Sequence, residues 1–285
     1  MNGKIIFSLS GTYCSSISSI AMLIKNINKE LIKVRHIDTE NKIVDLSRLE
    51  YMDSNLCVIL YAYLKLLIRY RSNMTNENYY LAMPHEEKLA THLKKNNFCS
   101  LWGEKNKYDY NNTIIKISEN RTDLESIIYL YKNLSPKLLN LGMKEDDVNE
   151  FISYLGELCT NAFQHGKSEY LYLSGQFYPN KHELDFTFFN IGNTFTENIS
   201  KVGVSQKYIS WAFIQGNTTS DSYGLGLSNF MDILNKYDAD IVIISDNEIY
   251  HKKNGIIEDK IDEGIYLPGT MINIKFNLDE YNVLK

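Results

Sequence analysis

The sequence lacks an apolar run long enough to span a membrane. Its longest apolar stretch, residues 56–68, is interrupted by Lys65, whereas a membrane helix needs about 20 apolar residues. The first ten residues also lack the extended apolar segment and the small-residue cleavage site of a secretory signal. These absences predict a cytoplasmic protein without a membrane partner.

Basic residues are also fewer than acidic residues. The 285 residues include 30 lysines and arginines against 35 aspartates and glutamates, for a formal net charge of −5. A protein built mainly to coat nucleic acid would have the opposite balance, so no nucleic-acid partner is expected. With 44% hydrophobic and 23% charged residues, the chain is predicted to be globular rather than disordered.

Cysteine is scarce as well, and no two cysteines are spaced as a CxxC pair. The four residues are Cys14, Cys57, Cys99 and Cys159. A disulfide framework and a zinc site are therefore not expected, and a reduced compartment is the simple interpretation.

One shift in composition divides the chain, which has no internal repeat. Residues 103–112 are polar and lack aliphatic side chains, and they separate the apolar segment 98–102 from the strand-like segment 113–117. We therefore predict two domains, 1–103 and 113–285, joined by a linker at 104–112.

Hydrophobic periodicity predicts an α/β fold class for both domains. In the first, strands are expected at 4–9, 42–46 and 79–83, and helices at 18–32, 56–71 and 86–96. This alternation favours a small, mostly parallel sheet with helices against it. In the second, two long helices precede most of the strands, which favours an α/β sandwich. The helices are expected at 122–141, 144–164 and about 225–236, and the strands at 170–177, 183–190, 241–245 and 271–278.

A polar triplet near the end of the second long helix is the first candidate for chemistry. Glu157, Asn161 and His165 are four residues apart in turn, which places them on one helix face. A carboxylate and an amide oxygen in this arrangement suit Mg²⁺, and the carboxylate can also act as a base toward water or a hydroxyl. Taken alone, the triplet could equally be a solvated helix face, and His165 could simply cap the helix before Gly166.

Two further segments combine strand ends with glycine. Asn190 and Gly192 close a strand, where glycine would let a flat ligand approach the backbone and the amide offers both a donor and an acceptor. Thr270 follows a Pro-Gly pair and places a hydroxyl where the last strand begins.

The fourth segment is a polar loop that ends in the sequence Gly224-Leu225-Gly226 and leads into a helix. Glycines before a helix N-terminus expose backbone N–H groups to an anion, and the helix dipole adds to the attraction. This segment is interpreted as a phosphate cradle.

In this order, the four segments resemble the GHKL superfamily of ATPases, which share the Bergerat nucleotide-binding fold. The superfamily includes gyrase, sensor histidine kinases and anti-sigma-factor serine kinases, and the Asn-Ala-x-x-His-Gly sequence at 161–166 is closest to the last group. The resemblance covers about residues 113–285 and implies ATP and Mg²⁺ as cofactors.

The resemblance also implies roles for individual residues. Asn161 would hold Mg²⁺, and Glu157 would act as base or contact a metal-bound water, with His165 beside them. Adenine would be contacted by Asn190 and Gly192, with Thr270 behind them, and the Gly224-Leu225-Gly226 turn would wrap the phosphates. The family usually has Asp in place of Asn190, and a second glycine in place of Thr194. An uncharged amide should bond the adenine amino group more weakly.

The first domain resembles the STAS domain of anti-sigma-factor antagonists. Residues 42–56 contain a strand that ends in Asp-Leu-Ser and a later Asp-Ser pair that opens a helix. In that family a hydroxyl at the helix start is phosphorylated by the partner kinase, and Ser54 is the hydroxyl available here. The alternative is that Ser54 and its neighbours only cap the helix.

Together, the two resemblances imply a bacterial regulatory protein of the partner-switching type that binds Mg-ATP. It would have slow ATPase or serine-kinase activity and would engage another protein, with a homodimer through the GHKL domain as one option. Because both domains share one chain, their encounter would be intramolecular. The alternative is a non-catalytic interaction module for which ATP is only a conformational ligand.

Overall fold

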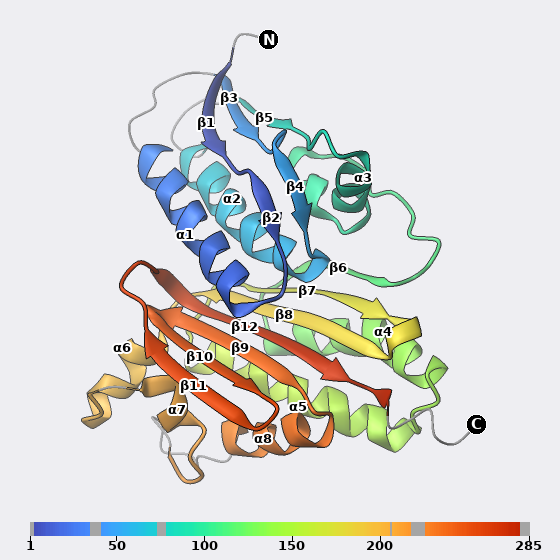
Figure 1. Cartoon of the computed structure of the whole chain (residues 1–285), viewed down its shortest axis with the longest axis vertical. Helices are drawn as coiled ribbons and strands as arrows, with labels where there is room; N and C mark the ends of the chain where they lie inside the picture. The colour runs from blue at the N-terminus through green and yellow to red at the C-terminus, as the bar shows by residue number, and fades with distance from the viewer. Residues whose placement is uncertain (1–2, 35–40, 73–77, 206, 218–225, 280–285) are drawn as a thin grey trace. The chain divides into compact units, whose positions relative to one another are not determined.

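A computed structural model describes residues 3–34, 41–72, 78–205, 207–217 and 226–279 (Figure 1). The chain divides into two compact units, residues 1–117 and 118–285. Both units combine helices with sheets, so the predicted α/β class is confirmed. The division falls inside strand β6 (Ile114–Asn120), and residues 104–112 form neither helix nor strand.

The first unit has a parallel sheet, as predicted. Its strand order is β1-β3-β5, and both neighbouring pairs are parallel. A second parallel pair, β2 with β4, escaped prediction because such short segments show no clear alternation. The strands are β1 (Lys4–Ser8), β2 (Gly11–Tyr13), β3 (Asn41–Asp45), β4 (Leu49–Met52) and β5 (Asn78–Ala82). The helices are α1 (Ile17–Val34), α2 (Cys57–Ser72), α3 (Glu87–Lys95), η1 (Ser54–Leu56) and η2 (Phe98–Trp102).

The second unit is built on one seven-stranded sheet with the order β11-β10-β9-β12-β8-β7-β6. From β7 to β11, all neighbouring strands are antiparallel. These strands are β7 (Leu171–Tyr178), β8 (Glu183–Ile191), β9 (Asp240–Asp246), β10 (Glu248–Lys253), β11 (Ile256–Ile261) and β12 (Leu267–Asn277). The β10–β11 hairpin was not predicted, although its Asn254-Gly255 turn is a known hairpin signal.

Three long helices lie along one face of this sheet: α4 (Asp123–Asn140), α5 (Glu145–Gln164) and α8 (Gly226–Lys236) (Figure 1). The ring of Phe151 in α5 lies 4.8 Å from that of Phe276 in β12 and 5.2 Å from that of Tyr237, just after α8. Shorter elements connect the layers: α6 (Phe195–Ile199), α7 (Tyr208–Ala212), η3 (Pro179–Lys181) and η4 (Ser200–Val202).

Strand register determines which side chains face the helices. Phe276 faces α5, so Thr270 and Ile272, at even spacing on the same strand, lie on the same face. Thr270 is directly opposite Asn190 on β8, and Ile272 is opposite Phe188. The fold therefore brings the two predicted polar residues at the strand ends together, beneath the helix layer.

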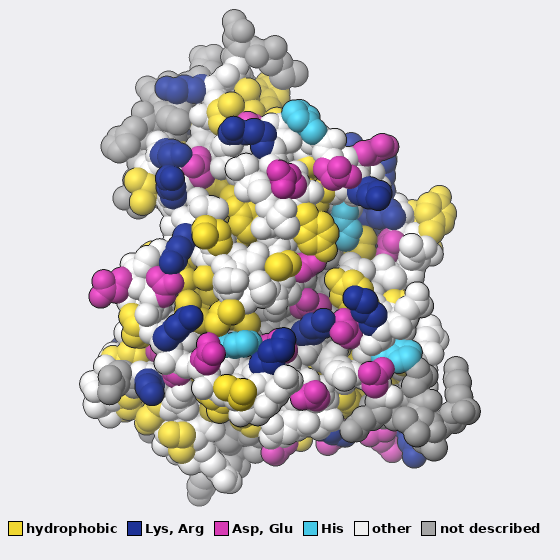
Figure 2. All heavy atoms as spheres, in the orientation of Figure 1, with side chains coloured by type: hydrophobic (Ala, Val, Ile, Leu, Met, Phe, Trp, Pro, Cys, Tyr) yellow, Lys and Arg dark blue, Asp and Glu magenta, His cyan; other side chains and the backbone are white. Residues whose placement is uncertain are grey.

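The surface carries charges of both signs. Figure 2 shows acidic and basic side chains interspersed over the face that it presents. None of the helices in the described part of the chain is long and apolar enough to cross a membrane. All four cysteines are free thiols, and three of them are buried.

Candidate functional site

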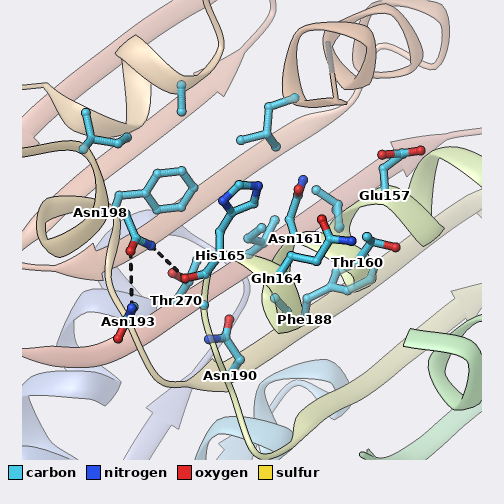
Figure 3. Close-up of a pocket in the computed structure, with 18 of the residues that line it drawn as sticks. Glu157, Thr160, Asn161, Gln164, His165, Phe188, Asn190, Asn193, Asn198 and Thr270 are labelled. Carbon is cyan, nitrogen blue, oxygen red and sulfur yellow. Dashed lines mark hydrogen bonds between the residues drawn. The ribbon is translucent and has the colours of Figure 1, made fainter. Parts of the chain in front are cut away.

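A cavity of about 230 Å³ lies in the second unit (Figure 3). Its walls come from α5, from β7, β8 and β12, from α6 and α7, and from the first turn of α8. Five of the predicted site residues line it: Glu157, Asn161, His165, Asn190 and Thr270. Side chains that are far apart in the sequence thus converge on one space.

Helix α5 supplies the first three of these side chains. Its first turn contains three acidic residues, 145–147, which suit a helix N-terminus. Phe151 and Leu155 are completely buried and fix the rotation of the helix. Glu157 is exposed, whereas Asn161 and His165 are half-buried. The predicted common face is therefore observed, and it borders the cavity.

His165 lies at the end of α5 and at the cavity. It is the C-cap residue of α5, and its backbone N–H donates to the carbonyl of Asn161 at 2.9 Å. It also lines the cavity, and burial lowers the pKa of its imidazole. The Nδ2 of Asn198 donates to the carbonyl oxygen of His165 at 2.9 Å, and Asn193 donates to Asn198 at 3.3 Å (Figure 3).

Two glycines allow the strand ends to approach the end of α5. A Cβ atom at Gly192 would overlap the carbonyl oxygen of Gly166, and one at Gly269, where φ is +146°, would overlap that of Asn190. The space at Gly192 was expected to admit a flat ligand, but backbone fills it. Gly192 is also absent from the described residues that line the cavity, so packing explains this glycine.

A hydrogen-bond network lies at the sheet end of the cavity. The Nδ2 of Asn190 donates to Ser168 Oγ at 2.7 Å. Across the strand pair, Thr270 Oγ1 lies 3.1 Å from Ser245 Oγ, which donates to the carbonyl of Gly269 at 2.7 Å. Neither serine was singled out from the sequence.

Thr194 stabilises the start of α6. The resemblance expects a second glycine at this position. Thr194 is the N-cap of α6, and its hydroxyl accepts from the N–H of Glu197 at 3.1 Å. Glu197 Oε2 in turn accepts from the N–H of Thr194 at 2.7 Å. This capping box begins the segment that brings Phe195, Asn198 and Ile199 to the cavity.

The glycine-rich segment is described only at its end. Gly224 and Leu225 lie outside the described residues, and Gly226 is the first residue of α8. Asn217 and Leu227 stand on either side of residues 218–225, and both line the cavity. The described residues on either side of this segment therefore line the same cavity as Glu157, Asn161 and His165.

A buried carboxylate holds α7, whose Trp211 and Ala212 line the cavity. Glu248 of β10 accepts hydrogen bonds from the N–H groups of Tyr208 and Ile209, at 3.1 and 2.8 Å. Burial and the nearby Asp259 carboxylate raise the pKa of Glu248 to about 7, against the two N–H bonds, which lower it. Asp259 also accepts a hydrogen bond from Ser210. The sequence did not predict α7 because the first N–H groups of this helix are bonded by Glu248 of β10, which is about 40 residues away in the chain.

Ser54, the candidate phosphorylation site, is 3% exposed and is the first residue of η1. Within the described structure, Asp53 at the N-cap position makes no side-chain cap bond. Asp53 instead accepts from the N–H of Ser15 at 2.7 Å and from the hydroxyl of Tyr51 at 2.6 Å. The predicted capping is therefore not seen for Asp53, and phosphorylation would require Ser54 to become accessible.

The oxygen atoms of the cavity suit a cation that takes only one or two ligands from the protein and the rest from water or phosphate. Among the described residues, no cluster of three or more His, Cys, Asp and Glu side chains could hold a metal ion. Glu157 and Asn161 nevertheless offer two oxygen donors on one helix face. Mg²⁺ commonly uses one or two protein oxygens together with water and phosphate oxygens, so this donor set fits Mg²⁺ bound with a nucleotide.

A scan against protein-family models and a search of curated proteins each found no match to this chain.

Proposed function

We propose that the cavity of the second unit binds Mg-ATP and that the chain is a regulatory protein of the partner-switching type. The convergence of Glu157, Asn161, His165, Asn190 and Thr270 on one cavity carries this proposal. It supports a GHKL-like second unit of Bergerat architecture. The parallel strands and the Asp53-Ser54 pair of the first unit support a STAS-like assignment there.

The chemistry of the lining residues supports an arrangement for the parts of ATP. The adenine ring fits the sheet end, where Asn190 and Thr270 are flanked by Leu171, Phe188 and Ile272. The triphosphate would then extend toward Asn161 and the first turn of α8. A helix N-terminus with free N–H groups favours an anion there.

Negative charge at the phosphates needs compensation. Among the described lining residues, Glu157 is the one acidic side chain, and none is lysine or arginine. Burial lowers the pKa of His165 and so disfavours a positive charge there. Bound Mg²⁺ would neutralise charge on the phosphate oxygens. Asn161 is placed to hold it through its amide oxygen.

Glu157 is suited to act as a base because it is exposed at the rim of the cavity. In hydrolysis it would accept a proton as water attacks the terminal phosphorus and the bond to the β-phosphate oxygen breaks. In transfer, a serine hydroxyl would replace the water. Ser54 is the proposed acceptor in the same chain.

Turnover of ATP by the full chain tests the catalytic part of the proposal. Glu157→Gln should keep ATP binding and lower phosphate release by about a hundredfold or more, as expected when a general base is removed. Glu145→Gln, which alters an exposed carboxylate in the first turn of the same helix, is the control and should change little.

Intact mass measured in the same incubations separates hydrolysis from transfer. Transfer predicts one added phosphate, absent in Ser54→Ala and in Glu157→Gln. If ATP binds but neither phosphate release nor added mass occurs, the catalytic proposal fails. A non-catalytic, nucleotide-gated interaction module would then describe the protein.

A further inference from the structure

The seven-stranded sheet of the second unit ends in two different edge strands, β6 and β11. In β6, Ile115 and Ile117 are buried. In β11, by contrast, Ile256, Ile257 and Ile261 are 68%, 52% and 51% exposed. In the part of the chain that the structure describes, no strand pairs with the outer side of β11, which borders the sheet in Figure 1. An exposed apolar edge of this kind is a template for another strand.

The features that usually protect an edge strand are weak in β11. Lysines, prolines and bulges are the devices that keep such edges from pairing. The six residues of β11 pair with β10 in continuous register, without a bulge, and none of them is proline. Lys260 is the one basic side chain of the strand, and it follows Glu258 and Asp259. The strand is therefore open to further backbone pairing.

The backbone groups that face the open edge can be identified. The N–H of Asp262 donates to the carbonyl of Asn247, which immediately precedes β10, at 2.8 Å. Because backbone groups alternate in direction along an antiparallel strand, the odd-numbered residues Ile257, Asp259 and Ile261 point theirs outward. The two-residue turn between β10 and β11, with positive φ at both positions, gives the same alternation, since it closes with a bond from its last residue back to β10.

The charges of β11 are complementary to a second copy of the same strand. An antiparallel pairing must join outward-facing residues to outward-facing residues. With a twofold axis at Asp259, Ile257 lies opposite the partner's Ile261. Glu258 then lies opposite the partner's Lys260, so opposite charges meet twice, as do the isoleucines. Sliding the copies by two residues in either direction would place Glu258 opposite Glu258 or Lys260 opposite Lys260, which is unfavourable.

Asp259 itself would lie opposite its own copy, but its carboxylate is engaged within its own chain. It accepts a hydrogen bond from Ser210 of α7 and lies beside the carboxyl of Glu248 on β10. Since β10 is the inner neighbour of β11, these contacts turn the carboxylate away from the open edge. The like charges at the axis are thereby kept apart.

We propose that two copies of this chain associate through β11, antiparallel about a twofold axis at Asp259, so that their sheets join into one. The interface is isologous, because each copy supplies the same strand and receives the same contacts. The charge pattern favours a second copy over a strand of another protein. This inference goes beyond the nucleotide proposal and does not rest on it.

Sedimentation equilibrium of the full chain without nucleotide tests the association. The average mass of the wild type should rise from that of one chain toward that of two as the concentration increases. Lys260→Glu places glutamates opposite each other in both charge pairs and should weaken association about tenfold or more. Combining it with Glu258→Lys reverses both pairs and should restore the wild-type affinity. The control is Lys132→Glu, an equal charge change at an exposed position of α4, which packs on β7 toward the other edge of the sheet, and it should have no effect.

Amide hydrogen exchange of the wild type, followed by NMR at low and high protein concentration, tests the strand itself. The outward N–H groups of Ile257, Asp259 and Ile261 should exchange more slowly at high concentration, because they become bonded to the second copy. The N–H groups of β6, at the opposite edge, should exchange at the same rate at both concentrations.

The mass of a single chain at every concentration would overturn the proposal. So would an association that Lys260→Glu leaves unchanged, or one that slows exchange in β6 rather than in β11. If Lys260→Glu weakens association and the double variant does not restore it, the register about Asp259 is refuted. None of these measurements uses nucleotide, so a failure of ATP binding would overturn the proposed function and leave this inference intact. The wild-type mass and exchange rates need no variant.

Discussion

Individual residues of the cavity work mainly through amides and hydroxyls rather than through charge. Asn161, Asn190 and Thr270 are all neutral, and Glu157 is the one carboxylate among the described lining residues. Neutral groups at fixed orientations discriminate by the direction of their hydrogen bonds. Behind the cavity, burial and the nearby Asp259 carboxylate raise the pKa of Glu248 to about 7.

Glu248 should make the stability of the second unit depend on pH. Its pKa is raised from 4.5 to about 7 in the folded chain, so the folded state holds the proton more tightly than the unfolded state. The stabilisation is complete below about pH 4.5 and is lost as the pH rises through about 7. Thermal unfolding should therefore show a falling midpoint between these values.

Glu248→Gln should flatten this dependence, because the amide resembles the protonated acid. The single oxygen of the amide can still accept from the N–H of Tyr208 or of Ile209, and its NH2 group can donate to Asp259. The unfolding midpoint of the variant should therefore change less between about pH 4.5 and pH 7 than that of the wild type. A variant whose midpoint follows the wild type at every pH would show that this carboxyl is not the group responsible.

Sequence spacing was sufficient to predict the α5 face but not the serines behind the strands. The face of Glu157, Asn161 and His165 follows from helical periodicity within a single segment. Ser168 is 22 residues from Asn190, and Ser245 is 24 residues from the carbonyl that it meets. Such pairings depend on strand register, which single-sequence periodicity does not determine.

At the scale of elements, the junction of α5 with β8 and β12 positions the site. Gly166, Gly192 and Gly269 allow backbone to lie against backbone there. This contact fixes Asn190 relative to the end of α5. The short helices α6 and α7 then close the cavity, and they differ in how far the sequence predicts them. The start of α6 can be recognised in the sequence, because Thr194 and Glu197 have the spacing of a capping box. By contrast, α7 depends on Glu248 from a distant strand.

Gly192→Ala tests this junction. The added methyl would overlap the carbonyl oxygen of Gly166, so relief requires a backbone shift, and we expect a loss of about 1–3 kcal/mol. Gly156→Ala is the contrasting variant within α5: its methyl would lie 3.3 Å from the Ile127 side chain, which would have to move by only a few tenths of an ångström. Alanine is favoured over glycine in helices by up to about 1 kcal/mol, which offsets the tight contact, so this change should cost less stability than Gly192→Ala. Equal denaturant midpoints for both variants would refute the packing role of Gly192.

The whole molecule joins two α/β units in one chain. The parallel sheet of the first unit was predictable because its strands and helices alternate in sequence. The full width of the second sheet was not predictable, because β11 is exposed along most of its length and β10, although mostly buried, contains charged residues with little apolar alternation. The domain boundary was predicted from a polar stretch at 104–112, whereas the compact units meet inside β6. A change in composition can indicate a linker. It does not show that β6 continues across the boundary after Ile117.

The central claim is that the cavity binds ATP with Mg²⁺ held at Asn161. Calorimetric titration of the full chain with ATP, with and without Mg²⁺, tests it most directly. We expect Mg-dependent binding at one site per chain, weakened about tenfold or more in Asn161→Ala. Binding should be unaffected in Asn149→Ala, an exposed asparagine of α5 away from the cavity. No binding under any of these conditions, or equal binding by Asn161→Ala, would contradict the claim.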